Sequence, residues 1–169
     1  SAAERILPII DIKNEISLNE NKDNLDISRG NIAFENVNFS YKSNLKNKVL
    51  QNINARFSGG KMTALVGHSG SGKSTLLNMI PRIYDPNDGK ILLDNQDISK
   101  FNLSSLRSQI SIVDQNTTLF DDTVLNNIKY ARPEASNEEV FEAAKQSMCD
   151  DFIDNLENKF ETMIGENGV

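Results

Sequence analysis

The sequence predicts a mixed α/β fold, and three features of the chain support that expectation. Residues 62–66 form a short apolar run, which is typical of a buried strand. This run leads into a glycine-rich loop at residues 67–75 and then into an apolar helix that ends at Pro81. Further upstream, residues 31–41 and 49–57 alternate between apolar and polar side chains, as half-buried strands do. We therefore expect antiparallel strands first, a strand–loop–helix unit next, and further helices after it.

The glycine-rich loop fits the pattern G-x-x-x-x-G-K-[ST], which is typical of a phosphate-binding loop. Its glycines let the backbone approach a ligand closely, so that successive N–H groups surround an anion at the start of a helix. Lys73 places a positive charge against the outer phosphates of a nucleotide, and Ser74 is placed to bind the Mg²⁺ that bridges them. The alternative, a chance match in a glycine- and serine-rich turn, is disfavoured by the strand before the loop and the helix after it. The candidate nucleotide-binding residues of the loop are Gly67, His68, Ser69, Gly70, Ser71, Gly72, Lys73, Ser74 and Thr75.

The strand at residues 31–41 changes face part-way along. Its apolar residues share one face up to Phe34 and the other face from Val37, which indicates a bulge near Glu35 and Asn36. A polar turn at residues 43–48 separates this strand from the next one.

Downstream of the loop the pattern remains that of an α/β protein. Residues 90–93 predict a short strand followed by a turn at 94–95, and residues 103–107 predict one or two helical turns capped by Asn102. Residues 110–113 predict another apolar strand, and Gln115 lies just beyond it.

The C-terminal third predicts helices. Thr123 and Ser136 are suited to cap two of them, and acidic residues follow Ser136 in the first turn, where the helix dipole favours them. The later apolar residues recur every four positions, which drifts around a straight helix, so we expect a break near Cys149. We interpret this stripe as packing in a core; its members are Val140, Ala144, Met148, Phe152, Leu156 and Phe160.

Composition narrows the class of protein. The 169 residues have the size of one domain or part of one, with 38% hydrophobic and 25% charged residues. The formal net charge of −6 argues against nucleic acid as a partner. Cys149 is the one cysteine, so no intrachain disulfide can form, which fits a reducing compartment. No apolar run reaches the length of a membrane span.

Several segments together resemble the nucleotide-binding domain of an ATP-binding cassette (ABC) exporter, and within that family the lipid A exporters of the bacterial inner membrane. The segments that carry the resemblance are residues 32–41, 67–75, 82–86, 105–107, 119–124 and 165–169, together with Gln115. The implied fold is the P-loop core of an ABC ATPase, with an N-terminal antiparallel β subdomain and part of an α-helical subdomain. By the same resemblance, residues 1–30 would be the linker from the last transmembrane helix, and residues 31–169 the N-terminal part of the nucleotide-binding domain.

The resemblance also implies roles for residues outside the loop. Tyr41 is similar to the aromatic residue whose ring stacks on adenine, although from the strand alone it would only mark a strand end. Gln115 is similar to the glutamine that completes the Mg²⁺ shell, and with Lys73 it would act in catalysis. Residues 162–168 are similar to a loop that contacts the transmembrane partner. His68 is not the family's switch histidine, which lies far downstream of the phosphate loop.

The implied activity is ATP hydrolysis coupled to export of a lipid or amphipathic substrate across the bacterial inner membrane, with the domain on its cytoplasmic face. The cofactors would be ATP and Mg²⁺. The partners would be the transmembrane domain of the same parent chain and a second nucleotide-binding domain in a homodimer. We expect the signature loop, the Walker B strand and the switch histidine to lie beyond Val169, so the printed chain should bind ATP without hydrolysing it.

Other classes of P-loop protein remain as alternatives. A GTPase would carry an Asn-Lys-x-Asp tetrad, which is absent, and a small-molecule kinase would carry an arginine-rich lid, whereas arginine is sparse after Arg107. A soluble P-loop ATPase or kinase without a membrane partner is the main alternative. Against one such protein, a soluble cassette ATPase, Gln115 and the Glu166 loop favour the exporter.

Overall fold

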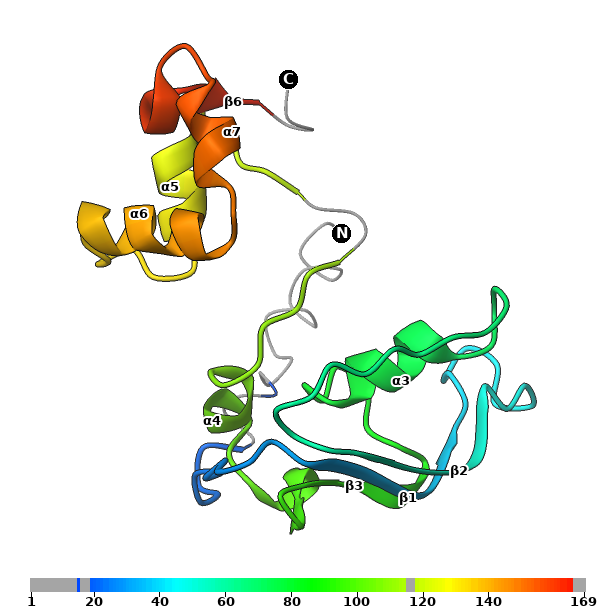
Figure 1. Ribbon diagram of the computed structural model, residues 1–169. Helices are drawn as coiled ribbons and strands as arrows, with labels where there is room; N and C mark the ends of the chain where they lie inside the picture. Colours follow the sequence, from blue (N-terminus) through cyan, green and yellow to red (C-terminus); the bar gives the residue numbers. More distant parts are fainter. Residues whose placement is uncertain (1–14, 16–18, 115–117, 166–169) are drawn as a thin grey trace, which may run out of the picture. The chain divides into compact units, whose positions relative to one another are not determined.

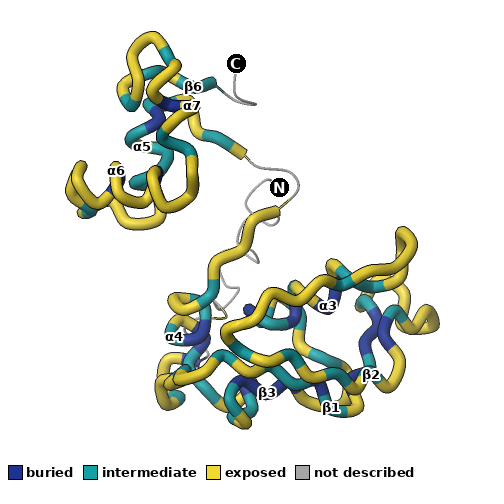
Figure 2. The backbone as a smooth tube through the Cα atoms, viewed as in Figure 1, coloured by how far each residue is buried: buried dark blue, intermediate teal, exposed yellow. Residues whose placement is uncertain are grey.

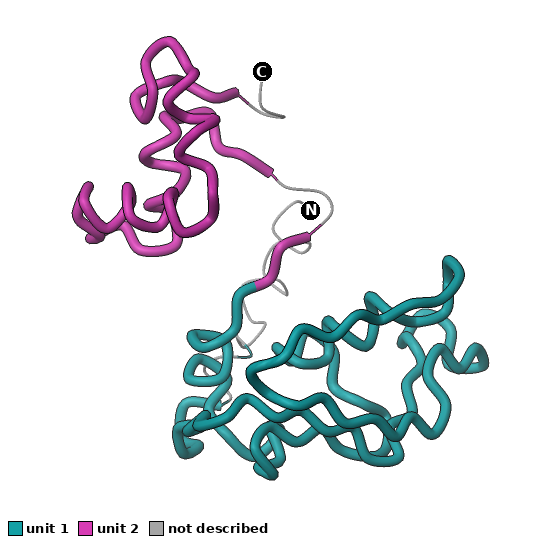
Figure 3. The backbone as a smooth tube through the Cα atoms, in the orientation of Figure 1, with its two compact units in different colours: residues 1–111 teal, residues 112–169 magenta. Residues whose placement is uncertain are grey.

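The computed structural model describes residues 15, 19–114 and 118–165. The chain divides into two compact units, residues 1–111 and residues 112–169 (Figure 3). The expected mixed α/β fold with an antiparallel β subdomain is confirmed, since the first unit contains a sheet and helices and the second is mainly helical (Figure 1). Among the described residues, no helix combines the length and apolar character that crossing a membrane requires.

The first unit is built on a four-stranded sheet in which every neighbouring pair is antiparallel. The strand order is β2-β1-β3-β4, so the first strand of the chain lies in the middle of the sheet. The strands are β1 (Ile32–Phe39), β2 (Leu50–Phe57), β3 (Asp88–Leu93) and β4 (Gln96–Asp97).

The irregularity predicted in the first strand is present in β1. Its register with β2 shifts between Phe34 and Val37, and Asn36 adopts a left-handed conformation with a φ of 52°. Because of the bulge, β1 can bury Phe34 before it as well as Val37 and Phe39 after it, although the two groups lie on different alternation phases of the strand. The predicted turn at Asp94 and Asn95 is also confirmed: both residues have positive φ, as a tight hairpin between β3 and β4 requires.

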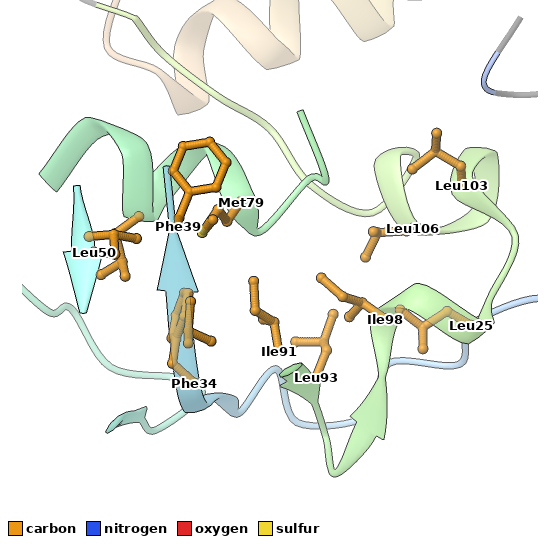
Figure 4. Packing of buried hydrophobic residues seen from close by; sticks show 12 residues of the cluster. Leu25, Phe34, Phe39, Leu50, Met79, Ile91, Leu93, Ile98, Leu103 and Leu106 are labelled. Atoms are coloured by element: carbon orange, nitrogen blue, oxygen red, sulfur yellow. The ribbon is translucent and has the colours of Figure 1, made fainter. Parts of the chain in front are cut away.

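Two helices and a 3-10 turn cover this sheet and complete one hydrophobic core (Figure 4). They are α3 (Lys73–Met79), η1 (Ile98–Lys100) and α4 (Leu103–Arg107), which the Asn102 side chain caps by accepting from the Ser105 N–H. Met79 of α3 and Leu106 of α4 are almost completely buried, as is Phe34 of β1. The core therefore fixes α3, and with it the end of the phosphate loop, against the sheet.

Two predicted strands do not form. Residues 62–66 and 110–113 have no strand conformation, and most of these residues are exposed (Figure 2). Met62, Val66 and Val113 are among the exposed large hydrophobic residues. The expectation rested on apolar runs, but a strand also needs a neighbour that accepts and donates its ladder hydrogen bonds. None of the described strands pairs with either run.

The polar segment before β1, which we predicted to be a linker, is packed against the first unit from Asn19 onward. Leu25 is buried in the core, and its N–H donates to Ser105 Oγ at 3.0 Å. The Asp94 carboxylate accepts the N–H groups of four successive residues, 28–31, at 2.7–3.0 Å. These bonds, led by the one from Arg29, hold the pKa of Asp94 far below its ordinary value of 3.8.

In the second unit, the described residues form short helices and a two-stranded ladder. Its elements are β5 (Asp122–Thr123), α5 (Val124–Lys129), α6 (Asn137–Gln146), α7 (Asp150–Asp154), η2 (Lys159–Glu161) and β6 (Met163–Ile164), and β5 pairs with β6. The predicted caps are confirmed. Thr123 Oγ1 accepts from the Asn126 N–H, and Ser136 forms a reciprocal capping box with Glu139.

The apolar stripe of the second unit is only partly core. The break near Cys149 is confirmed, but Met148 and Phe152 are exposed, and Ile153 is the residue of α7 that enters the core with Val124 and Ala144. Phe152 lies on a different face than the spacing predicted because Met148, between the two helices, has a left-handed conformation with a φ of 57°. The helical periodicity of α6 therefore does not continue into α7. Spacing carried across that turn therefore assigned the wrong face of α7.

Candidate nucleotide site

The candidate site begins with the phosphate loop at residues 67–75, which runs directly into α3. Gly72 is the residue before the first helical turn and has a φ of 87°, a left-handed conformation that suits glycine. A Cβ at Gly72 would lie 2.8 Å from Leu50 Cδ2 and 3.3 Å from the Val49 carbonyl oxygen. The loop backbone therefore rests against the start of β2, and the antiparallel sheet sets its position.

Lys73 turns its side chain back into the loop. Its Nζ donates to the carbonyl oxygens of Gly67 and His68, both at 2.9 Å, and to Ser71 Oγ at 3.3 Å. The ammonium group is therefore held at the centre of the loop, where a nucleotide phosphate would bring further oxygens to it. His68 takes part through its carbonyl oxygen.

Ser74 lies in the first turn of α3, next to Lys73, and its side chain is exposed. Among the described residues no cluster of three or more His, Cys, Asp or Glu side chains could hold a metal ion. Mg²⁺ is usually bound through one or two protein side chains together with phosphate oxygens, and the Ser74 hydroxyl is exposed at the position where it could supply one such ligand. Gln115, the second predicted ligand, lies outside the described residues.

Thr75 connects the loop to Tyr41. The two hydroxyl oxygens are 2.8 Å apart and hydrogen-bonded, and Thr75 is buried in the first turn of α3. The structure thus brings Tyr41, which is 34 residues away from Thr75 in the chain, to the helix that begins with Lys73. Ser69 and Gly70 form the turn at the tip of the loop.

Tyr41 also borders a hollow with a volume of about 480 Å³. Two other aromatic side chains line the hollow, Phe39 from β1 and Tyr84 from the loop after α3, and charged side chains join them, among them Lys42, Arg82 and Asp85. An aromatic wall with charged neighbours is suited to a planar, polar ring system.

Sequence reasoning did not identify Tyr84 as part of this region, although residues 82–86 carried the family resemblance. Tyr84 lies 43 residues after Tyr41 (84 − 41), and no periodicity predicts their contact. The only feature of the sequence that could have indicated a role for Tyr84 is that it is an aromatic residue close to a turn.

Comparison with known proteins adds independent information. Residues 50–168 match the family model described as ABC transporter. The whole chain is 45% identical to the ATP-dependent lipid A-core flippase of Pectobacterium atrosepticum, and 44% identical to the flippases of the same name from Salmonella typhimurium and Escherichia coli. It spans 29% of the length of each of these relatives.

Solved structures agree with this comparison. A bacterial Atm1-family ABC exporter with ATP bound matches 98% of the chain with a TM-score of 0.88 and 38% sequence identity, and the match covers 28% of that exporter. The resemblance that the sequence motifs suggested is therefore confirmed by similarity over nearly the entire chain.

Proposed function

Because the chain belongs to the ABC transporter family, as the ATP-binding domain of an exporter related to the lipid A-core flippases, we propose that residues 67–75 bind Mg-ATP. The observation that carries the proposal is the Lys73 ammonium, held 2.9 Å from two loop carbonyl oxygens at the start of α3. The first-turn amides of a helix have no intrahelical partner, so they are available to phosphate oxygens.

Each part of the nucleotide has a candidate partner in this proposal. Lys73 and the loop amides bind the phosphates, and Ser74 and Gln115 bind Mg²⁺, which neutralises charge on the phosphates and orients them. Tyr41 stacks on adenine, and its hydrogen bond to Thr75 supports this role by joining the aromatic wall to the phosphate loop.

We further propose that the chain works as part of a longer membrane protein. Residues 1–30 would lead from the last transmembrane helix, and residues 31–169 would form the N-terminal part of the nucleotide-binding domain. That domain would pair with a second copy on the cytoplasmic face of the bacterial inner membrane, and ATP hydrolysis would drive export of a lipid or another amphipathic compound. Hydrolysis would require residues beyond the 169 printed here, and Lys73 and Gln115 would contribute to it.

The binding proposal is tested by calorimetry of the 169-residue chain with Mg-ATP. We expect saturable binding that Lys73→Ala abolishes, because the ammonium is the positive charge at the centre of the loop. Lys61→Ala removes the same charge from an exposed position outside the loop and should bind like the wild type. Equal affinities of the wild type and Lys73→Ala would contradict the assigned site.

Two further assays address the activity. Phosphate release by the 169-residue chain should remain at the background rate while ATP binds, and turnover would contradict the proposed need for further residues. In proteoliposomes of the complete membrane protein, movement of a fluorescent lipid should require ATP and should stop in Lys73→Ala. ATP-independent movement, or ATP hydrolysis that no lipid or amphipathic compound stimulates, would contradict the proposed export function.

A further inference from the structure

We infer that Tyr84 is a positioning residue that holds the Tyr41 ring ready to stack on adenine, an inference that rests on the proposed function. Tyr41 and Tyr84 meet edge to face, with ring centroids 5.3 Å apart and an angle of 87° between the rings. Phe39 closes the set, with its centroid 5.0 Å from that of Tyr41 and 5.5 Å from that of Tyr84. Contacts of this geometry are favourable, and here each ring touches the other two.

The loop that carries Tyr84 is itself fixed by two arginines. Arg82 donates two hydrogen bonds to the Asp85 carboxylate, at 2.8 and 3.0 Å, so these two residues clamp the turn on either side of Tyr84. Arg107 of α4 donates to the carbonyl oxygens of Pro81 at 2.9 Å and of Arg82 at 2.8 Å. The position of Tyr84 is therefore set by the core helix α4 and by its own turn.

The same loop is hydrogen-bonded to the end of β1 and to the segment that follows it, in which Tyr41 is located. The Asn87 N–H donates to the Asn38 carbonyl oxygen at 2.9 Å, and the Asn87 side chain accepts from the Ser40 N–H. Tyr41 and Tyr84 thus stand on two segments that are hydrogen-bonded to each other, which holds the two segments side by side where the rings meet.

The Tyr41 ring is restrained at its other end by the hydroxyl bond to Thr75. A side chain that is already fixed loses less conformational freedom when a ligand binds, and this saving strengthens binding. The aromatic platform should therefore contribute to affinity for the base through its pre-organisation, beyond the stacking that an unrestrained tyrosine would give. Affinity for the phosphates alone should not depend on this pre-organisation.

The test compares two ligands on the 169-residue chain: Mg-ATP, and inorganic tripolyphosphate with Mg²⁺, which lacks the base. Tyr84→Leu removes the ring contact, and we expect it to weaken Mg-ATP binding about 2- to 10-fold, the effect of freeing one side chain. Tripolyphosphate binding should change less than about twofold, because it does not use Tyr41. Tyr84→Phe keeps the ring and should restore Mg-ATP affinity.

Tyr41→Phe provides a second variant that does not depend on Tyr84→Leu being folded. It keeps the stacking ring and removes only the hydroxyl bond to Thr75, and we expect Mg-ATP binding to weaken about 2- to 10-fold, which corresponds to one hydrogen bond. The chain contains no tryptophan, so tyrosine emission can report whether the aromatic cluster is intact in each variant.

The outcomes separate this inference from the proposed function. If Tyr84→Leu weakens both ligands equally, or if it binds Mg-ATP as the wild type does, Tyr84 does not position the base platform. If Tyr41→Phe binds Mg-ATP as the wild type does, fixing the Tyr41 ring does not strengthen binding, and the inference is overturned as well. If the wild type binds tripolyphosphate as tightly as Mg-ATP, the base makes no contribution and the inference is also overturned. Failure of the wild type to bind Mg-ATP at all would instead overturn the proposed function, and the inference with it.

Discussion

Substituting alanine for Gly72 should disturb both the stability of the first unit and the phosphate loop. With a φ of 87° at this residue, an L side chain costs about 1–2 kcal/mol relative to an ordinary backbone conformation. The new Cβ would also lie 2.8 Å from Leu50 Cδ2. Leu50 is buried in the core and has little room to move, so this overpacking adds about 1–3 kcal/mol. The sum is about 2–5 kcal/mol.

Two other glycines provide matched controls for Gly72→Ala. Gly70 and Gly60 also have positive φ, 78° and 69°, but a Cβ at either would have no atom within 4 Å. Gly70→Ala and Gly60→Ala should therefore cost only the conformational part, about 1–2 kcal/mol each. All three substitutions reduce the flexibility of the unfolded chain to a similar extent, so this contribution cancels when the variants are compared.

Urea unfolding of the three variants, combined with Mg-ATP calorimetry, separates the two effects. The free energy of unfolding should fall most in Gly72→Ala, and the excess over Gly70→Ala measures the contact with Leu50. Nucleotide binding should weaken in Gly70→Ala and Gly72→Ala, which lie in the loop, and should persist in Gly60→Ala, which lies before it. If Gly72→Ala is no less stable than Gly70→Ala, the loop does not rest against β2 as described.

Three further changes test the packing, the Asp94 network and a helix cap. Phe34→Ala should lower the free energy of unfolding by about 3–5 kcal/mol in urea, because Phe34 is buried in the core, and a loss below 1 kcal/mol would contradict that packing. Because the pKa of Asp94 is lowered in the folded protein, its contribution to stability is complete above its ordinary pKa of 3.8 and is lost as the pH falls below that value. The free energy of unfolding of the wild type should therefore decline more steeply below about pH 4 than that of Asp94→Asn. Parallel curves of unfolding free energy against pH would argue against the network. Ser136→Ala should destabilise the second unit by about 1 kcal/mol in a thermal melt, with Ser136→Asp retaining the cap, and equal melting of all three proteins would show that the capping box adds nothing.

Local rules in the sequence predicted the antiparallel part of the fold. The bulge in β1 followed from the change of face between Phe34 and Val37, and the turn after β3 from Asp94 and Asn95, because each depends on neighbouring residues. The caps Asn102 and Ser136 were predictable for the same reason. The fold class and the phosphate loop could therefore be predicted from the sequence alone.

Features that depend on distant residues were not predictable in this way. The apolar runs at residues 62–66 and 110–113 have the composition of strands, but composition does not tell whether a partner strand lies beside them. Leu25 is buried because the polar segment that carries it donates backbone N–H groups to the distant side chains of Ser105 and Asp94, and such bonds leave no pattern in the segment's own side chains. Tyr84 was missed because its contact with Tyr41 arises from the sheet and the turn after α3 together.

The four methionines of the chain differ sharply in their solvent accessibility, so their oxidation can report whether the first unit is folded. Met62, Met148 and Met163 are exposed, whereas Met79 on α3 has no accessible surface. Peroxide converts a thioether to a sulfoxide only where the reagent can reach the sulfur. Mild oxidation of the folded chain should therefore mark three methionines and leave the fourth reduced. A sulfoxide at Met79 would then report, in a peptide mass spectrum, that the helix after the phosphate loop had left the sheet.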